Sequence, residues 1–167
     1  MRKYLFLLAA ATLPLGAMAA DKSPDEGFYE DAAEAGLAEV ATGKLAQTKG
    51  ASPAVKEFAA MMVKDHSAAN AKLKAIADAK GIKLPTEPGL KHKAKKEMLE
   101  HQDGADFDKG YIDGQIKDHE ETAALLEKEI ANGKDPEAKA FARETLPKVQ
   151  AHLKAINAIK AGHSDKH

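Results

Sequence analysis

Residues 50–59 read GASPAVKEFA and residues 133–142 read GKDPEAKAFA, so a glycine, a capping residue and a proline recur at an offset of 83 positions. Ser52 and Asp135 are residue types that cap the first turn of a helix, and proline suits the first helical position. A lysine, a phenylalanine and an alanine keep the same register further along. The repetition predicts two helical hairpins of similar construction.

Four long helices follow from these caps and from the glycines and prolines that end helical segments. Their expected ranges are residues 24–49, 53–80, 105–131 and 136–161. No segment alternates between polar and apolar residues with a period of two, so no β-sheet is expected. The chain is therefore predicted to be all-α, with one bundle domain over residues 24–161.

The connection between the two hairpins, residues 82–104, is longer than a simple bundle turn needs. Pro85 and Pro88 interrupt it, and residues 89–102 favour a short helix. A connection of this length suits the long crossover of ferritin-like bundles. We therefore expect a ferritin-like four-helix bundle of two repeated hairpins, joined by a long crossover that contains a short helix.

Composition excludes several classes of function. The 167 residues are 44% hydrophobic and 31% charged, which is typical of a soluble globular chain. There is no cysteine, which excludes disulfides, thiolate metal sites and a cysteine nucleophile. The net charge of −1 gives no indication of nucleic-acid binding. No glycine-rich phosphate loop or common hydrolase motif occurs, so no catalytic residue is assigned.

The two ends of the chain are expected to lie outside the bundle. Residues 1–20 combine Arg2 and Lys3, a short apolar run and an Ala-Met-Ala site, the pattern of a cleaved secretory signal peptide. The run is too short to span a bilayer, so no integral membrane span is expected after cleavage. The protein is predicted to be periplasmic or secreted, and it could be a component of the envelope. The sequence does not identify a partner. Residues 162–167 are expected to form a disordered tail.

Three histidines fall within the apolar faces of the predicted helices. His66 interrupts the apolar stripe of the second long helix, and His119 and His152 interrupt those of the third and fourth. On the first long helix, Glu39 falls among small residues. At a rise of about 1.5 Å per residue, all four groups lie roughly 17–24 Å from a hairpin turn. One group from each helix is therefore expected to converge near the middle of the bundle.

This convergence indicates one of two roles. A buried polar group without a partner costs about 1–3 kcal/mol, so the imidazoles must be paired or must bind something. Neutral imidazoles and a carboxylate suit a divalent transition metal, and the candidate ligands are His66, His119, His152 and Glu39. The alternative is a structural network of histidines and carboxylates in a noncatalytic interaction module of the envelope.

Two aspartates directly precede candidate ligands. Asp65 comes before His66, and Asp118 comes before His119. Adjacent residues lie about 100° apart around a helix, so neither aspartate is expected to share its neighbour's metal. Each is instead expected to orient an imidazole ring on a neighbouring helix.

Several short stretches resemble the DUF4142 family of exported bacterial proteins, and the resemblance covers about residues 28–159. They are AGLAEV at 35–40, MVKDHS at 62–67, FDKGYI at 107–112, DHE at 118–120, LP at 146–147 and HL at 152–153. The resemblance implies a ferritin-like four-helix bundle and export, and supplies no established activity.

Ferritin-like kinship also implies a di-iron centre, and here the sequence departs from that pattern. Those centres need a glutamate three residues before a ligating histidine on two helices. The corresponding positions hold Val63, Ile116 and Val149, none of which can bind a metal. The sequence therefore favours a single histidine-rich metal site, used in metal handling or envelope stress, or no metal at all.

Overall fold

The computed structural model describes residues 24–164, and residues 1–23 and 165–167 lie outside the described part of the chain. The signal peptide predicted for residues 1–20 is among the latter. The elements are α1 (Pro24–Lys49), α2 (Pro53–Ala79), α3 (Leu90–Glu100), α4 (Gly104–Asn132) and α5 (Pro136–Ser164). Every regular element of residues 24–164 is a helix, which confirms the all-α prediction.

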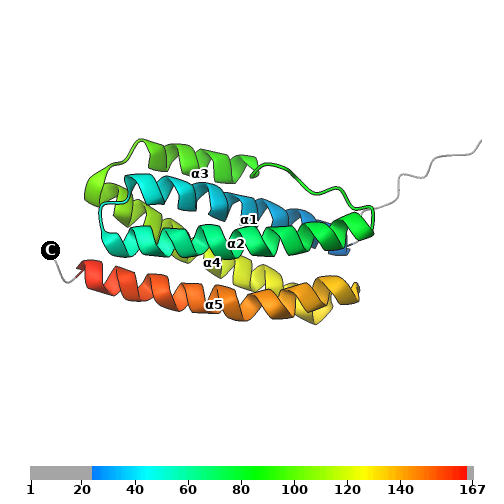
Figure 1. The fold of residues 1–167 in the computed structure, drawn as a ribbon. Helices are drawn as coiled ribbons and strands as arrows, with labels where there is room; N and C mark the ends of the chain where they lie inside the picture. Colours follow the sequence, from blue (N-terminus) through cyan, green and yellow to red (C-terminus); the bar gives the residue numbers. More distant parts are fainter. Residues whose placement is uncertain (1–23, 165–167) are drawn as a thin grey trace, which may run out of the picture.

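The long helices form two antiparallel hairpins, α1 with α2 and α4 with α5, that pack side by side (Figure 1). The crossover runs back along the bundle, and α3 lies against α1 and α4. This return path makes α4 parallel to α2, as the predicted ferritin-like connection requires. Within residues 24–164, no helix is both long enough and apolar enough to cross a membrane.

The predicted caps are present at both hairpin turns. The Ser52 hydroxyl accepts a hydrogen bond from the Val55 N–H at 3.2 Å, and the Asp135 carboxylate accepts one from the Glu137 N–H at 2.9 Å. Each cap satisfies a backbone donor that the first helical turn leaves without an intrahelical partner. The four helix starts and ends differ from the predictions by one residue or none, except at the C-terminus of α5.

The predicted end of the last helix at Ala161 is wrong. Helix α5 continues through Gly162 to Ser164, so the disordered tail expected from residue 162 does not begin there. A single glycine costs a helix only about 1 kcal/mol, and it does not end one by itself. His163, which was expected in the tail, is therefore helical and half-buried, with its Nε2 at 3.8 Å from the Asp108 carboxylate.

Each hairpin turn is held by an aspartate from the other hairpin. Asp108 of α4 accepts hydrogen bonds from the backbone N–H groups of Ala51 and Ser52, both at 2.8 Å. Asp25 of α1 accepts the equivalent bonds from residues 134 and 135, at 2.8 and 3.3 Å. The two aspartates are themselves 83 positions apart. The repeat that the sequence shows is therefore also a repeat of tertiary contacts.

The interior consists of two apolar clusters, one at each end of the bundle. One cluster is built around Phe28, Leu73, Leu126 and Phe141, and the other around Phe58, Met62, Phe107, Tyr111 and Ile156. Between them lies a layer of buried polar side chains from all four long helices. Its members are Glu39, His66, Gln115, His119 and His152. This layer is the candidate functional site.

Candidate metal centre

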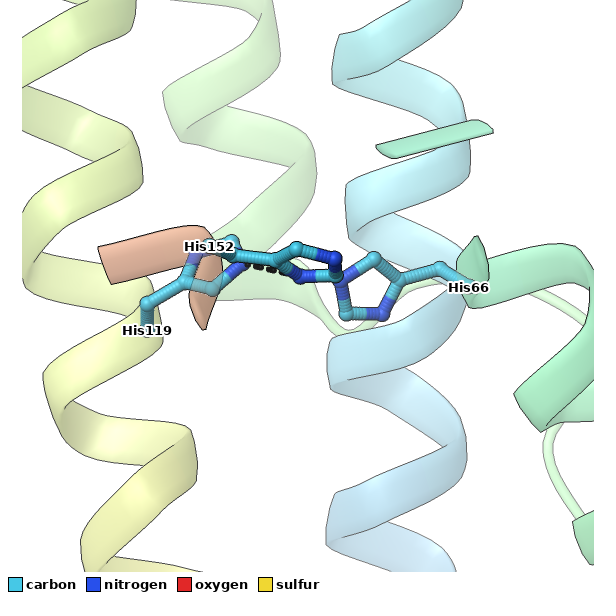
Figure 2. A group of neighbouring side chains, drawn as sticks. All are labelled: His66, His119 and His152. Carbon is cyan, nitrogen blue, oxygen red and sulfur yellow. Dashed lines mark hydrogen bonds between the residues drawn. The ribbon is translucent and has the colours of Figure 1, made fainter. Parts of the chain in front are cut away.

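The structure brings the three predicted histidines together in the centre of the bundle. His66 comes from α2, His119 from α4 and His152 from α5, and their rings point toward one another (Figure 2). Their exposed fractions are 7%, 1% and 4%. Every long helix except α1 thus contributes one imidazole to a common space that solvent does not reach. The interior stripes that the sequence predicted are what turn these side chains inward.

The ring geometry is close to that of a shared ligand set. The ring centroids lie 5.4–5.6 Å apart, and one nitrogen of each ring lies within 4.8 Å of the other two. His119 Nε2 and His152 Nδ1 are only 3.4 Å apart. Nitrogens bound to one metal at about 2.0–2.1 Å would be separated by about 3.3–3.6 Å. A small movement of His66 would therefore complete a three-nitrogen site.

The hydrogen bonds of the outer nitrogens fix which tautomers are present. His119 Nδ1 lies 2.9 Å from the Gln115 carbonyl oxygen, and His152 Nε2 lies 3.0 Å from an oxygen of Asp65. Since both partners are acceptors, each of these nitrogens must carry the hydrogen and donate it. The other nitrogen of each neutral ring, His119 Nε2 and His152 Nδ1, is then an acceptor with a bare lone pair.

Two lone pairs therefore face each other across 3.4 Å in the middle of the site. No hydrogen lies between them while both rings are neutral and keep their outer hydrogen bonds. The third ring adds another unsatisfied atom, because His66 Nε2 is buried and has no hydrogen-bond partner. Two lone pairs that face each other beside an unpartnered ring nitrogen form an arrangement that a cation would satisfy.

Burial keeps two of the rings neutral. Desolvation, together with the neighbouring rings of His119 and His152, lowers the pKa of His66 to about 3. Desolvation likewise lowers the pKa of His119 to about 4, assisted by His152 and opposed by the hydrogen bond to the Gln115 carbonyl. The rings are thus in the form that can bind a metal, since only a neutral imidazole has a lone pair to offer.

Glu39 lies in the same layer and outside the group of three nitrogens. Its Oε2 accepts a hydrogen bond of 2.6 Å from Gln115 Nε2, and its Oε1 lies 3.8 Å from His119 Nδ1. This is the outer side of the His119 ring, opposite the nitrogen that faces His152. Desolvation raises the pKa of Glu39 to about 8, although the bond from Gln115 opposes the shift. The structure thus places Glu39 behind a candidate ligand, and the group that could hold an ion consists of the three histidines.

The two aspartates that precede candidate ligands have different partners. Asp65 hydrogen-bonds His152 on α5, which confirms the expectation that it orients a ring on a neighbouring helix. The same expectation is wrong for Asp118, whose carboxylate pairs with Lys95 on α3. The crossover helix supplies a cation at that point, and its position could not be inferred from the sequence of α4 alone.

Gln115 is the member of the site that sequence reasoning missed. Its side chain holds Glu39 and its backbone carbonyl holds His119, so it connects two other members. The only signal in the sequence is its position four residues before His119, one turn along the same helix face. The apolar stripe of this helix passes through the adjacent Ile116, so the pattern gives no sign that Gln115 is buried.

A di-iron centre does not fit this site. The positions one turn before the histidines hold Val63, Ile116 and Val149, as the sequence indicates. Such centres bind through carboxylates from several helices, and here the candidate ligand group contains nitrogens only. The donor set is that of a single ion with imidazole ligands.

Comparison with protein families places the chain. The family model named Domain of unknown function (DUF4142) matches residues 10–159, which is most of the sequence. The protein belongs to the DUF4142 family. No curated protein gives a significant sequence match.

Solved structures share the fold of this DUF4142 protein at low sequence identity. A DUF305 fragment from Deinococcus radiodurans has a TM-score of 0.73 at 12% identity, over 82% of this chain and 95% of that one. A DUF305 protein from Streptomyces coelicolor, named as a secreted protein, has a TM-score of 0.73 at 13% identity, over 85% and 94%. CopM in its Cu(I)-bound form has a TM-score of 0.70 at 14% identity, over 84% and 98%. At these identities the comparison establishes the fold.

Proposed function

We propose that this DUF4142 protein is exported and binds one transition-metal ion through His66, His119 and His152. The observation that carries the proposal is the pair of lone pairs that face each other at 3.4 Å beside the unpartnered Nε2 of His66. Two facing acceptors and an unpartnered ring nitrogen destabilise a metal-free core, because each buried unsatisfied group costs about 1–3 kcal/mol. A metal ion bound between the rings removes that penalty.

A monovalent soft ion, Cu(I) or Ag(I), is the first candidate among the transition metals. The cost of burying an ion rises with the square of its charge, and the three ligands are neutral. Zinc held by three imidazoles ordinarily completes its coordination with a water molecule, whereas a three-coordinate Cu(I) or Ag(I) needs no fourth ligand, and within residues 24–164 no fourth donor joins the three nitrogens. Crystal structures of CopM, which shares the fold, are named for bound Cu(I) and Ag, and this supports the choice of probe.

The outer hydrogen bonds give the proposal a second line of support. A histidine that binds a metal usually donates its other N–H to a carboxylate or a backbone carbonyl, which fixes the ring and its tautomer. His152 does so to Asp65, and His119 does so to Gln115. Both rings are therefore oriented before any ion arrives.

The alternative function is a noncatalytic interaction module of the envelope, in which the same groups form a structural network. The contact between His152 and Asp65 and the contacts of Gln115 with Glu39 and His119 are the observations that favour it. Under this alternative the histidines stabilise the fold and bind no ion, and function depends on surface residues.

The deciding experiment measures metal binding by protein purified without an affinity tag. Apo protein is titrated with Cu(I) in competition with a chromophoric chelator, and with Ag(I), Zn(II), Ni(II), Fe(II) and Mn(II) by thermal shift. We expect one Cu(I) or Ag(I) per chain, lost in His66→Leu and retained in His101→Leu, which removes an exposed histidine of the crossover. A wild-type protein that binds none of these ions leaves only the interaction module.

Export is tested separately, by the mass of the protein recovered from its native envelope. Cleavage after Ala19 or Ala20 is expected, from the signal pattern in residues 1–20. A recovered chain that still begins at Met1 would contradict it.

A further inference from the structure

Phe58 of α2 packs against two of the three histidines. Its ring centroid lies 6.4 Å from that of His119 and 6.5 Å from that of His152, within the usual range for contacts between aromatic rings. The side chain is only 3% exposed. Because the two distances are almost equal, Phe58 covers both rings together, and these are the rings whose inner nitrogens lie 3.4 Å apart.

Neighbouring side chains hold Phe58 in this place. The fully buried ring of Tyr111 lies against it, with the centroids 6.4 Å apart and the ring planes at 71°. Both residues belong to the apolar cluster at the end of the bundle that contains the first hairpin turn. Since a close-packed cluster leaves little room for a ring to move, Phe58 stays against the two histidines.

The opposite side of the polar layer is also covered by apolar side chains. Leu73 of α2, Leu126 of α4 and Val149 of α5 lie one or two helical turns from the histidine of the same helix, toward the other end of the bundle. Each of them is 1% exposed, and all three belong to the second apolar cluster. The three-histidine site is thus covered by apolar side chains in both directions along the bundle.

Coverage of this kind distinguishes metal ions by the number of ligands that they need. Zinc held by three imidazoles keeps a water molecule as its fourth ligand, and a buried water needs about two to four polar partners. The hydrogen-bonding groups of the site, Asp65 and the Gln115 carbonyl, lie on the outer sides of the rings. On the side of Phe58, a water molecule would meet an aromatic ring. A three-coordinate Cu(I) or Ag(I) ion needs no such water, so the same ring does not hinder it.

We propose that Phe58 determines the metal preference of the three-histidine site, because it closes a position in which a water molecule would complete the coordination of Zn(II). The inference rests on the proposed function for the site itself, and it adds the residue that selects among the ions. A smaller or a polar side chain at position 58 should therefore admit divalent ions.

The sequence repeat supplies a matched control. Phe141 lies 83 residues after Phe58 and is buried to a similar extent, with an exposed fraction of 5%. It belongs to the second apolar cluster, where its ring centroid lies 6.3 Å from that of Phe28. Its distance from His152 is about 16 Å along α5. Phe141→Ala therefore removes the same side chain from the equivalent position and leaves the histidines covered.

The experiment compares metal binding by apo Phe58→Ala and apo Phe141→Ala. Zn(II) is titrated in competition with a chromophoric chelator, and Co(II) is the spectroscopic probe, since tetrahedral Co(II) has an intense visible absorption. We expect Phe58→Ala to bind Zn(II) at least about tenfold more tightly than the wild type or Phe141→Ala, and to give the tetrahedral Co(II) spectrum, because water completes the coordination. The affinity for Cu(I) should change much less in both variants. Phe58→Leu, which keeps an apolar cover, should retain the metal preference of the wild type.

A second variant serves if the cavity in Phe58→Ala prevents folding. Phe58→His keeps an aromatic ring and offers a fourth nitrogen, so it should bind Zn(II) more tightly than Phe141→His does. Unchanged Zn(II) affinity in the folded Phe58 variants, or an equal gain in the Phe141 variants or in Phe58→Leu, would overturn the role of Phe58. A wild type that binds neither Cu(I) nor Ag(I) would count against the proposed function, whereas a gain of Zn(II) binding confined to Phe58→Ala and Phe58→His would still support the role of Phe58.

Discussion

Among the single residues of the site, His66 differs from the other two histidines in what its ring lacks. His119 and His152 each have an acceptor for the outer N–H, whereas His66 Nε2 is buried without a partner. In the absence of metal, the His66 ring destabilises the folded protein. Selection for metal binding would explain why His66 is retained, because functional sites commonly keep groups that destabilise the apo protein.

The first prediction concerns the effect of His66 on the stability of the apo protein. His66→Leu should leave the apo protein as stable as the wild type or more stable by about 1 kcal/mol, because an apolar side chain of similar size replaces an unsatisfied polar one. The free energy of unfolding from urea denaturation measures this, with His66→Ala as the variant that adds a cavity. A loss above about 2 kcal/mol in His66→Leu would show that the ring has a stabilising partner.

The second prediction separates the two aspartates. Asp65→Asn should weaken binding of Cu(I) or Ag(I) by about 10–100-fold, since the carboxylate orients His152 and increases its basicity. Asp118→Asn is the matched control, because it also precedes a ligand but pairs with Lys95. The affinity of Asp118→Asn for Cu(I) or Ag(I) should stay much closer to that of the wild type in the same competition titration. Equal losses in both variants would contradict the assigned role of Asp65.

At the scale of single residues the sequence is informative about the candidate ligands and less so about their hydrogen-bond partners. The position of each histidine in an apolar stripe was enough to predict that His66, His119 and His152 meet. The role of Gln115 and the pairing of Asp118 with Lys95 depend on how close separate helices lie. Helical periodicity gives the direction of a side chain and not the identity of what it meets on another helix.

Among the elements, the two hairpin turns show how the halves of the molecule hold each other. Each turn presents two backbone N–H groups to an aspartate of the opposite hairpin. Neither hairpin can therefore satisfy its own turn. The offset of 83 residues also relates Asp25 to Asp108, so the same repeat that predicted the turns could have identified their partners.

The third prediction follows from these contacts. Asp108→Ala should lower the free energy of unfolding by about 1–3 kcal/mol, because the N–H groups of Ala51 and Ser52 lose their acceptor. Asp25→Ala should act in the same direction at the other turn. Asp106→Ala, which removes an exposed acid from the first turn of α4, should cost less than about 1 kcal/mol in the same denaturation series. Similar losses in Asp106→Ala and Asp108→Ala would contradict the role of the turn contacts.

The fourth prediction concerns pH at the second turn. Desolvation, together with a hydrogen bond to Asp25, raises the pKa of Glu129 to about 7. The folded state then holds one more proton than the unfolded state between pH 4.5, the ordinary value, and pH 7. The contribution of Glu129 is thus fully present below that range and is lost as the pH rises through it, by up to about 1.4 kcal/mol per unit.

Glu129→Gln isolates this effect, because glutamine can donate to Asp25 and does not titrate. The difference in unfolding free energy between wild type and variant should shift in favour of the variant as the pH rises from about 4.5 to about 7. Chemical denaturation at several pH values measures it. A difference that stays constant over this range would show that Glu129 does not retain its proton in the fold.

The sequence predicts a helix boundary correctly where local hydrogen bonds determine it, and incorrectly where packing determines it. The caps at Ser52 and Asp135 are local, and they fixed two helix starts. Gly162 predicts the end of the last helix, yet α5 continues past it. A glycine weakens a helix by an amount that neighbouring residues and packing can outweigh, so its position alone does not mark an end.

Across the whole molecule, the metal site would connect the two hairpins. His66 belongs to the first hairpin, and His119 and His152 belong to the second. An ion held by all three would therefore act as a cross-link between halves that also meet through side-chain packing, the turn contacts, and polar contacts such as that of His152 with Asp65. Metal binding should therefore stabilise the entire bundle against unfolding.

The fifth prediction is the size of that effect. Ag(I) at about 100 times its dissociation constant should raise the free energy of unfolding by about 2.7 kcal/mol, because it binds the folded state only. For a domain of this length the midpoint of thermal unfolding should rise by roughly 5–10 °C. Calorimetry with and without Ag(I) measures the shift, and His66→Leu should show none. An equal shift in the variant would place the ion elsewhere.

The repeat and the site do not share the same symmetry. At the offset of 83 residues, His66 corresponds to Val149, His119 to Gly36 and His152 to Ala69. The hairpin scaffold thus occurs twice, whereas each candidate ligand occurs once, without a counterpart in the other hairpin. If an ancestral hairpin was duplicated, its two copies supplied a scaffold of matching halves, and the chemistry was added later by substitutions that made those halves unequal.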